Sequence, residues 1–397
     1  MAHPRFEPLI LKWAREKRFG PKIEILETVW QDSWREVSPD LVRAWENGSS
    51  QPTFAQARKL AEIYKRPLAV FFLASPPDEK QNPPDLRTIG SHDNEFLSPE
   101  ALLVIRKARR IQEISVGLSE DLGERPSFKY RRCSLSDDPA ELGERIRNDL
   151  SVSIHDQFGS KRYEDFFEHL RSKIESTGVI TLKSGLHDSF PIADCRAFSF
   201  TDQLPYLILV NNKDTEGAKN FSLLHEFAHI FLREAGICNN FRSFGARRGA
   251  NPVEAFCNQF AANFLVPKEH LVGHRILSGR TKVPPEEVDS LSERLALAFK
   301  VSRVVILRRL IMLDYVPSSL YATKTKAWGD ESPARPKKGG TFSLKTTLMK
   351  NGLAFSSLVL EAYRKNKISY AGVSDYLGLK TKHLPGFEKL IDLHAAR

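Results

Sequence analysis

The sequence is poor in cysteine and has no long run of apolar residues. Four cysteines are spread over 397 residues without a C-x-x-C pair, so neither a disulfide framework nor a cysteine-bound zinc is expected. The longest apolar run, around Pro67 to Ala74, is far shorter than the ~20 residues that a membrane-spanning helix needs. The N-terminus also lacks the apolar stretch of a secretory signal. We therefore expect a cytoplasmic protein with reduced thiols and no membrane span.

Charge and size limit the class of protein further. Lys and Arg total 59 against 49 Asp and Glu, which gives a net charge of +10. This surplus suggests nucleic-acid binding only weakly, because basic clusters such as Arg106 to Arg110 also fit a solvated surface. Gly and Pro are ordinary in number, and 41% of the residues are hydrophobic, enough for a globular core. At roughly 100 to 200 residues per domain, the length predicts two or three domains.

Two proline-rich stretches divide the chain. Both combine Pro with polar residues and lack hydrophobic periodicity over most of their length, which is typical of exposed connectors. The predicted parts are a helical domain at 1–75, a linker at 76–95, a central body at 96–316, a second linker at 317–340 and a small helical segment at 341–397.

The N-terminal segment has clear helix signals. Ser38 before Pro39 predicts a helix start, and Gly48 marks its end. Another helix follows from Thr53. The run Ala44-Trp45-Glu46-Asn47-Gly48, followed by Pro52-Thr53, resembles the second half of a repressor-type (XRE-type) helix-turn-helix domain.

The expected recognition helix is poorly suited to DNA. Its only cation is Arg43, which stands beside Asp40 and Glu46, whereas bases and phosphates require hydrogen-bond donors. A carboxylate that faces a phosphate would repel it. Two interpretations stay open for this segment: weak DNA binding, or a retained structural or protein-docking module.

The central body begins with helices and continues with strands. Helix starts are predicted at Leu97-Ser98-Pro99-Glu100 and at Asp138-Pro139, and an apolar stripe from Tyr163 to Ile174 predicts a third helix. After Gly178 the hydrophobic period changes to two. This pattern predicts strands at Val179 to Leu182, Ala197 to Thr201 and Tyr206 to Val210. We therefore expect an α+β fold that is mostly helical and has a small sheet.

The last predicted strand leads into a helix of particular interest. We expect the strand, from Pro205 to Asn211, to form a sheet edge on which an extended peptide substrate can lie. The helix carries Phe221, Leu224 and Phe231 on an apolar face. Burial of this face would fix the helix against the sheet.

On that helix stands the motif His225-Glu226-Phe227-Ala228-His229, an H-E-x-x-H pattern. Residues four apart differ by about 40° around a helix axis, so His225 and His229 project from one side and can bind one zinc ion. Glu226 is rotated by about 100° and can take a proton from a zinc-bound water that attacks a carbonyl. The motif predicts peptide-bond hydrolysis. The alternative is an ordinary helix with two surface histidines.

Glu254 is the best candidate for a third zinc ligand. It stands in the first turn of a helix that Asn251-Pro252 begins. The same position suits a capping box, in which Glu254 would bind its own helix start, and both interpretations stay open. Asn258, one turn later, could hold a ligand imidazole as a second-shell partner. Cys257 is interpreted as a small buried apolar residue.

The two helices together resemble the ImmA/IrrE family of zinc metallopeptidases. That family pairs H-E-x-x-H with a later E-x-x-x-N-x-F-A-x-x-x-L-x-P block, which is present here from Glu254 to Pro267. The resemblance extends to Pro84–Thr88, Leu295–Leu310 and Gly339–Leu384. It implies a zincin-like core, a gluzincin-type Zn2+ site on His225, His229 and Glu254, and Glu226 as the base. It also implies a helix-turn-helix regulator as protein substrate.

Two functions therefore compete. The first is a zinc endopeptidase that hydrolyses a peptide bond in a regulator protein, and the intact Glu226 favours it. The second is a DNA-binding regulator or antitoxin-like binding module whose peptidase body senses but does not cut. Candidates for stabilising the oxyanion are Tyr206, His270 and His274. The sequence does not specify the substrate or the oligomeric state.

Overall fold

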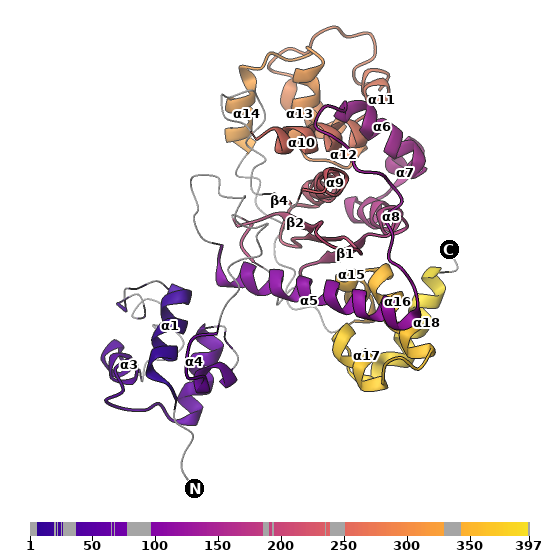
Figure 1. Ribbon diagram of the computed structural model, residues 1–397. Coiled ribbons are helices and arrows are strands. Elements are labelled where there is room, and N and C mark those ends of the chain that lie inside the picture. The colour runs from indigo at the N-terminus through magenta and orange to yellow at the C-terminus, as the bar shows by residue number, and fades with distance from the viewer. Residues whose placement is uncertain are drawn as a thin grey trace. The chain divides into compact units, whose positions relative to one another are not determined.

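The computed structural model describes residues 6–19, 21, 23–24, 26, 37–64, 66, 68–77, 97–185, 190–192, 194–234, 236–238, 251–328 and 343–395. The chain divides into two compact units, Met1–Asp93 and Asn94–Arg397, whose elements Figure 1 labels. None of the described helices combines the length and hydrophobicity that a membrane span requires. The first predicted linker and the motif Pro84–Thr88 lie largely or wholly outside the described residues. The second predicted linker, 317–340, is described up to residue 328 and contains a helix at Leu320–Trp328 in place of the expected irregular connector.

The N-terminal unit is helical. Its described elements are α1 (Pro8–Phe19), α3 (Pro39–Glu46), α4 (Phe54–Tyr64) and the 3-10 helix η1 (Leu68–Phe72). The predicted start of α3 is confirmed, because the Ser38 hydroxyl accepts a hydrogen bond from the backbone N–H of Leu41. Trp45 and Phe71 are buried in the small core of this unit.

Glu46 has a structural role that the sequence interpretation missed. Its carboxylate accepts two hydrogen bonds from the Arg15 guanidinium of α1, at 2.6 and 2.9 Å, and both side chains are almost fully buried. Position 46 lies one turn after the buried Val42 and so shares the inner face of α3. The sequence interpretation counted Glu46 among the carboxylates beside Arg43 that would repel DNA, but its side chain is buried against Arg15. Glu46 instead joins α3 to α1.

The second unit is a mostly helical α+β fold with a small sheet, as predicted. Its four strands are β1 (Ile180–Lys183), β2 (Ala197–Phe200), β3 (Leu207–Val210) and β4 (Gly236–Cys238), in the order β1-β3-β2-β4. β1 and β3 are parallel, and the other pairs are antiparallel. The three predicted strands match β1, β2 and β3 within about a residue, and β4 was not predicted.

The expectation that the third predicted strand forms a sheet edge is wrong. β3 lies inside the sheet, where β1 pairs with one of its sides and β2 with the other. All four residues of Leu207–Val210 are apolar and buried. Such a continuous apolar run is typical of a strand covered on both faces, and it carries no sign of an exposed edge.

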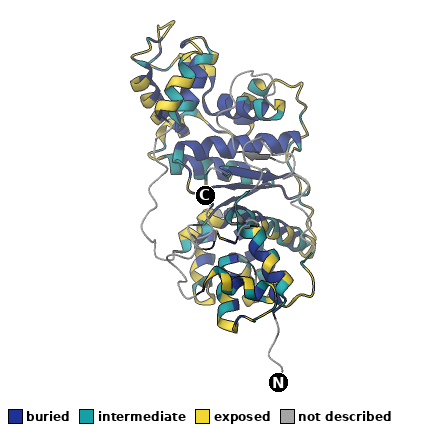
Figure 2. Cartoon of the chain, turned by 90° about the vertical axis from the view of Figure 1, so that its left-hand side faces the viewer, coloured by how far each residue is buried: buried dark blue, intermediate teal, exposed yellow. Residues whose placement is uncertain are grey.

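Helices cover both faces of the sheet. α8 (Tyr163–Glu175) and α9 (Glu216–Leu232) lie on one face, and α5 (Pro99–Leu122) crosses the other (Figure 1). Figure 2 shows α9 as a largely buried helix above the strands. Every residue from Gly217 to Leu232 is buried. The sequence interpretation expected only one face of this helix to be buried. It underestimated the burial of α9, because the helix runs through the middle of the unit.

A third helical layer packs on α9. α10 (Pro252–Leu265) contacts α9, and α6 (Pro139–Asp149) contacts α10. Three buried side chains donate hydrogen bonds to the carbonyl groups at the end of α10: Arg147 to Phe264 (2.8 Å), Gln157 to Leu265 (2.9 Å) and Arg309 to Val266 (2.9 Å). Guanidinium groups at this position also complement the negative end of the helix dipole. These side chains come from α6, α7 (Ile154–Gly159) and α13 (Arg303–Met312).

The remaining helices complete the second unit. They are α11 (Lys268–Val272), α12 (Val288–Phe299), α14 (Leu320–Trp328), α15 (Leu344–Asn351), α16 (Leu353–Arg364), α17 (Tyr370–Leu377), η3 (Thr381–His383) and α18 (Leu384–Ala395). α15 and α16 pack against β1, and α16 also packs against α5 and α8. The segment predicted as a separate part at 341–397 therefore belongs to the same compact unit as the central body.

A buried carboxylate ties these C-terminal helices to the sheet layer. Glu175, at the end of α8, accepts hydrogen bonds of 3.1 Å from the backbone N–H groups of Leu353 and Ala354 in the first turn of α16. The neighbouring Arg171 donates to the carbonyl oxygen of Met349 at 2.6 Å. The start of α16 and the end of α15 are thus both held by side chains of α8.

Candidate functional site

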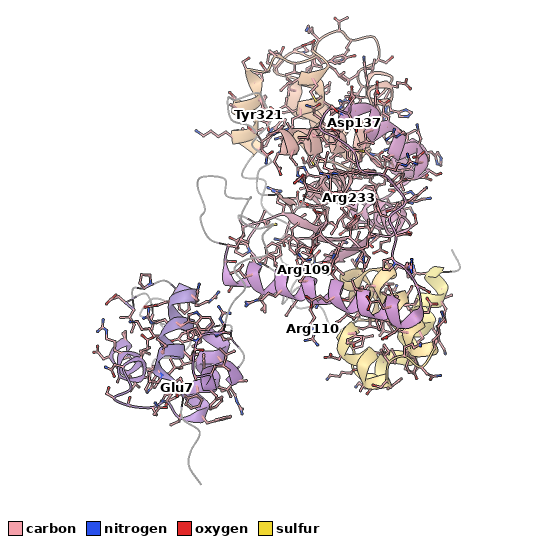
Figure 3. The ribbon with its side chains drawn as sticks, viewed as in Figure 1. Glu7, Arg109, Arg110, Asp137, Arg233 and Tyr321 are labelled. Atoms are coloured by element: carbon pink, nitrogen blue, oxygen red, sulfur yellow. The ribbon has the colours of Figure 1, made fainter. Side chains whose placement is uncertain are left out.

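The two ends of α9 fix its position in the unit. Near its start, a Cβ atom on Gly217 would lie 2.8 Å from the backbone of Val301, so only glycine allows this close approach. At its end, Arg233 adopts a left-handed conformation with φ 57°. The guanidinium of Arg233, a residue that Figure 3 labels, lies 4.5 Å from the ring centre of Tyr206 and 4.8 Å from that of Phe128. The helix cannot slide without breaking one of these contacts.

His225, His229 and Glu254 converge to one point. The Nε2 atoms of the two histidines are 3.2 Å apart, and each lies 3.3 Å from an oxygen of the Glu254 carboxylate. Ligands that surround a zinc ion tetrahedrally at 2.0–2.1 Å are roughly 3.3 Å from one another. Within the described part of the chain, this is the group of three side chains found to suit a metal ion. The donor set therefore fits zinc in both type and spacing.

The surroundings of His225 favour metal binding. Its Nδ1 lies 3.1 Å from the Oδ1 of Asn258 on α10. An amide oxygen only accepts hydrogen bonds, so Nδ1 carries the proton and the lone pair of Nε2 faces Glu254 and His229. The structure thus brings Asn258 and His225 together, and the role of Asn258 as a second-shell partner of a metal ligand stays a prediction.

The start of α10 bears on the two interpretations of Glu254, as a zinc ligand and as part of a capping box. The Asn251 side chain caps the helix by accepting a hydrogen bond of 3.0 Å from the N–H of Val253. The Glu254 carboxylate is directed at His225 and His229. Burial opposes ionisation of Glu254, but the two imidazoles outweigh this effect and hold its pKa well below the usual range. The side chain of Glu254 is 26% exposed, whereas the two histidines are at most 1% exposed, so solvent reaches the cluster from the Glu254 side.

Glu226 of α9 lies beside the cluster, next to Ser199 of β2. Its Oε2 accepts a hydrogen bond of 2.7 Å from the hydroxyl of Ser199. Its Oε1 is buried and has no hydrogen-bond partner among the described residues. Burial raises the pKa of the Glu226 carboxyl, and the nearby His229 and His225 partly offset this effect. The site thus contains a carboxylate with one oxygen held and the other available.

Ser199 is a site residue that the sequence interpretation missed. Ser199 lies on β2, 27 positions before Glu226 in the sequence. No sequence motif links the two residues. The one available signal was a hydroxyl group in the otherwise apolar strand Ala197–Phe200, where all residues are buried. Buried hydroxyl groups usually have a polar partner.

The other residues singled out from the sequence have separate surroundings. The ring of His274 packs edge-on against Phe158, and its Nδ1 accepts a hydrogen bond from Ile276. His270 is exposed on α11. Cys257 is fully buried and forms no disulfide bond, in agreement with its interpretation as a small buried residue. Tyr206 lies under Arg233, and an oxyanion role for any of these side chains stays a prediction.

Comparison with known families identifies the part of the chain that carries this site. Residues 186–311 match the M78 peptidase family model, described as the IrrE N-terminal-like domain. This part of the chain is a domain of the ImmA/IrrE family. The ImmA/IrrE domain includes α9 and α10, and its family indicates a metallopeptidase-type function that uses a metal ion. Searches of curated proteins and of solved structures found no match to the chain.

Proposed function

We propose that the protein is a zinc-dependent endopeptidase that cleaves a regulator protein. The observation that carries this proposal is the triangle of His225, His229 and Glu254 with edges of 3.2 to 3.3 Å. Two imidazole nitrogens and one carboxylate oxygen are the ligand set of several catalytic zinc sites, which leave a coordination position open. A structural zinc would instead have four protein ligands.

Zinc would be held by the Nε2 atoms of His225 and His229 and by the Glu254 carboxylate. When bound, it supplies a Lewis acid that activates water and polarises the carbonyl of the scissile bond. Asn258 supports this arrangement from outside, because its amide oxygen fixes the tautomer of His225. Partners of this kind typically change metal affinity by about 10- to 100-fold.

Glu226 is proposed as the general base. Its Oε1 is free to accept a proton from the attacking water, while Ser199 holds Oε2 and so fixes the plane of the carboxylate. A raised pKa helps both halves of the reaction, since a stronger base takes the proton more readily and the resulting acid can deliver it to the leaving amine. The buried position also excludes bulk water from this transfer.

The substrate class rests on the resemblance to the ImmA/IrrE family, which implies a helix-turn-helix regulator. The N-terminal unit is proposed to dock this protein and not to read DNA. Arg43, the cation of α3, pairs with Asp40 at 2.9 Å and with Glu24 at 2.7 Å. These carboxylates compete for the guanidinium that DNA phosphates would need.

The decisive experiment compares the zinc-loaded protein with its Glu226→Gln variant. Each is incubated with purified helix-turn-helix regulators encoded beside its gene, and the products are identified by gel electrophoresis and mass spectrometry. We expect one defined cleavage site with the parent protein and none with the variant, at equal zinc content. Equal cleavage by both proteins would exclude Glu226 as the base. Absence of cleavage by either protein, with the regulator bound tightly, would favour the binding-module alternative.

A further inference from the structure

The C-terminal end of the second unit contains a pair of helices joined by a tight turn. α17 is followed by Gly378, whose φ of 65° is a left-handed conformation that favours glycine. Leu379 and Lys380 then lead into η3, which runs directly into α18. The side chain of Leu379 is buried and anchors the turn. Helix pairs of this kind, with a turn of three or four residues, are the framework of helix-turn-helix domains.

α16 packs against this pair. It contacts both α17 and α18, and Figure 1 shows the three helices together at the C-terminal end of the chain. On α18, the buried side chains of Leu384, Phe387 and Ile391 repeat at helical spacing and so face the unit. The other side of α18 is exposed and includes Lys389 and Leu393. The pair therefore presents one side to its own unit and the other to solvent.

The starts of the two helices lie side by side. The hydroxyl of Tyr370, the first residue of α17, donates a hydrogen bond of 3.0 Å to the carbonyl oxygen of Thr381, the first residue of η3. Tyr370 is 38% exposed, so this contact lies at the surface. Lys367 precedes Tyr370 by three residues, and Lys380 and Lys382 flank Thr381. Two separate segments thus bring lysines to one small area.

These lysines are available to bind a ligand. Lys367, Lys380 and Lys382 are exposed. Lys389 is exposed too, and it follows Lys382 by about two helical turns and so shares its side of the helix. We call these four residues the lysine surface. None of them forms a hydrogen bond or an ion pair with the part of the chain that the structure describes.

The carboxylates around the lysine surface are mostly engaged elsewhere. Asp375 of α17 pairs with Arg110 at 3.3 Å, and Asp392 of α18 pairs with Arg364 at 2.8 Å. Glu388 is the remaining carboxylate of α17, η3 and α18, and it is half-buried. Four lysines against this one carboxylate give a formal charge of +3. The lysine surface therefore attracts an extended anion.

We propose that the lysine surface binds the phosphate backbone of duplex DNA. Helix-turn-helix domains lay the second helix of the pair against DNA with its first residues nearest to the bases, and Lys380 and Lys382 stand at this end. Lysine ammonium groups neutralise phosphates as flexible point charges. Arg43 of the N-terminal unit differs from these lysines, because two carboxylates already bind its guanidinium.

The contact is expected to depend little on DNA sequence. The helix from Thr381 to Ala395 contains no Asn or Gln to read adenine and no Arg for a bidentate contact to guanine. Phosphate contacts position a protein on DNA without reading its sequence. Such a contact would hold the protein on DNA that a helix-turn-helix regulator also binds. This consequence rests on the proposed function, whereas the binding itself does not.

Fluorescence anisotropy of a short labelled duplex, titrated with the full-length protein, measures the affinity at several salt concentrations. We expect a plot of log K against log salt concentration to have a slope of about −3 to −4, as for about four phosphate contacts. The double variant Lys380→Gln/Lys382→Gln should weaken binding at least about tenfold at low salt and make the slope shallower by about 2. Both side chains are exposed, so the melting temperature should stay close to that of the parent protein.

The matched control is Lys268→Gln/Lys326→Gln, which removes the same charge from exposed positions of α11 and α14 and should leave binding unchanged. Hydrogen exchange should show protection of residues 367–382 when the duplex is added. The proposal is overturned if the duplex does not bind at low salt, or if the control weakens binding as much as Lys380→Gln/Lys382→Gln. It is also overturned if phosphatidylserine vesicles bind at the lysine surface and duplex DNA does not.

Discussion

Ser199 on β2 donates a hydrogen bond of 2.7 Å to the Glu226 carboxylate on α9, and both side chains are buried. The bond connects the sheet directly to the proposed catalytic base. It leaves one carboxylate oxygen to exchange a proton and holds the other still. Ser199 is therefore expected to position Glu226 without touching the substrate.

Ser199→Ala should lower kcat by about 10- to 100-fold, because a hydrogen bond to a charged group contributes about 1.5–3 kcal/mol. The zinc content and KM should stay close to those of the parent protein. Steady-state kinetics on a cleavable regulator would measure this. Ser199→Thr keeps the hydroxyl and should recover part of the rate. Ser222→Ala is the matched control, because Ser222 is also buried but its hydroxyl has no hydrogen-bond partner among the described residues.

Glu254→Gln should lower zinc affinity at least about 100-fold, because the amide is a poor ligand for zinc. Asn258→Ala should have a smaller effect, about 10- to 100-fold, since it acts through His225. Competition with a chelator of known affinity measures both. Glu269→Gln, at an exposed position of α11, is the control. Full zinc occupancy in Glu254→Gln would support the capping-box interpretation of Glu254 instead.

The N-terminal unit should contribute little sequence-specific DNA affinity. Binding of the full-length protein to DNA is expected to be weak and to fall steeply with salt, as for non-specific contacts to phosphates. Footprinting and fluorescence anisotropy at physiological salt would show this, and Arg43→Ala should change neither result. A footprint on one operator that persists in physiological salt and disappears in Arg43→Ala would contradict the docking role and favour a regulator.

Gly352→Ala should destabilise the protein by about 3 kcal/mol or more. Gly352 links α15 to α16 with φ 78° and ψ 165°, a conformation that is essentially restricted to glycine. An added Cβ would also lie 2.5 Å from the carbonyl oxygen of Thr181 and would collide with the Glu175 carboxylate. Urea denaturation measures the loss. Gly123→Ala is the control, because Gly123 has φ 73° but open space around it, and it should cost only about 1 kcal/mol.

Asp289 should make the attachment of α14 dependent on pH. Its carboxylate accepts hydrogen bonds from Lys324 at 2.7 Å and from the indole N–H of Trp328 at 3.0 Å. The hydrogen bond from Lys324 is the main cause of the lowered pKa of Asp289. Because the folded-state pKa is the lower one, this stabilisation is complete above the ordinary value of about 3.9 and is lost as the pH falls through the lowered value.

Asp289→Asn is therefore expected to lower the free energy of unfolding by about 0.5–1 kcal/mol near neutral pH, the range of a partly exposed ion pair. The difference from the parent protein should shrink as the pH falls below about 3.9, the ordinary pKa of an Asp carboxyl, and through the lowered pKa of Asp289. Urea denaturation between pH 3 and 7 measures both values. Glu293→Gln, at an exposed position of the same helix, should show no such change. A difference that is constant over this range would rule out the titration of Asp289 as its cause.

The sequence predicts those parts of the site that depend on short-range geometry. The spacing of His225 and His229 follows from the helix period, and the Asn251-Pro252 pair indicates the start of α10. These signals act within one or two turns. They therefore remain readable without knowledge of the rest of the fold.

Relations between distant elements could not be predicted in this way. Nothing in the apolar run of β3 shows whether one or two strands pair with it, so its central place in the sheet was missed. The partner of Glu226 on β2 and the partner of Glu46 on α1 depend on packing between segments 27 and 31 residues apart. A carboxylate on a helix looks the same in a sequence whether it faces water or a buried guanidinium.

The end of α10 has a consequence for any attempt to excise the ImmA/IrrE domain. The family match begins at residue 186, but Arg147 and Gln157, which bind the last carbonyl groups of the helix that carries Glu254, precede it. β1 also precedes the match, so a fragment cut at its borders would leave one side of β3 unpaired. A fragment that folds on its own therefore has to be longer than the matched residues 186–311 and has to start before α6.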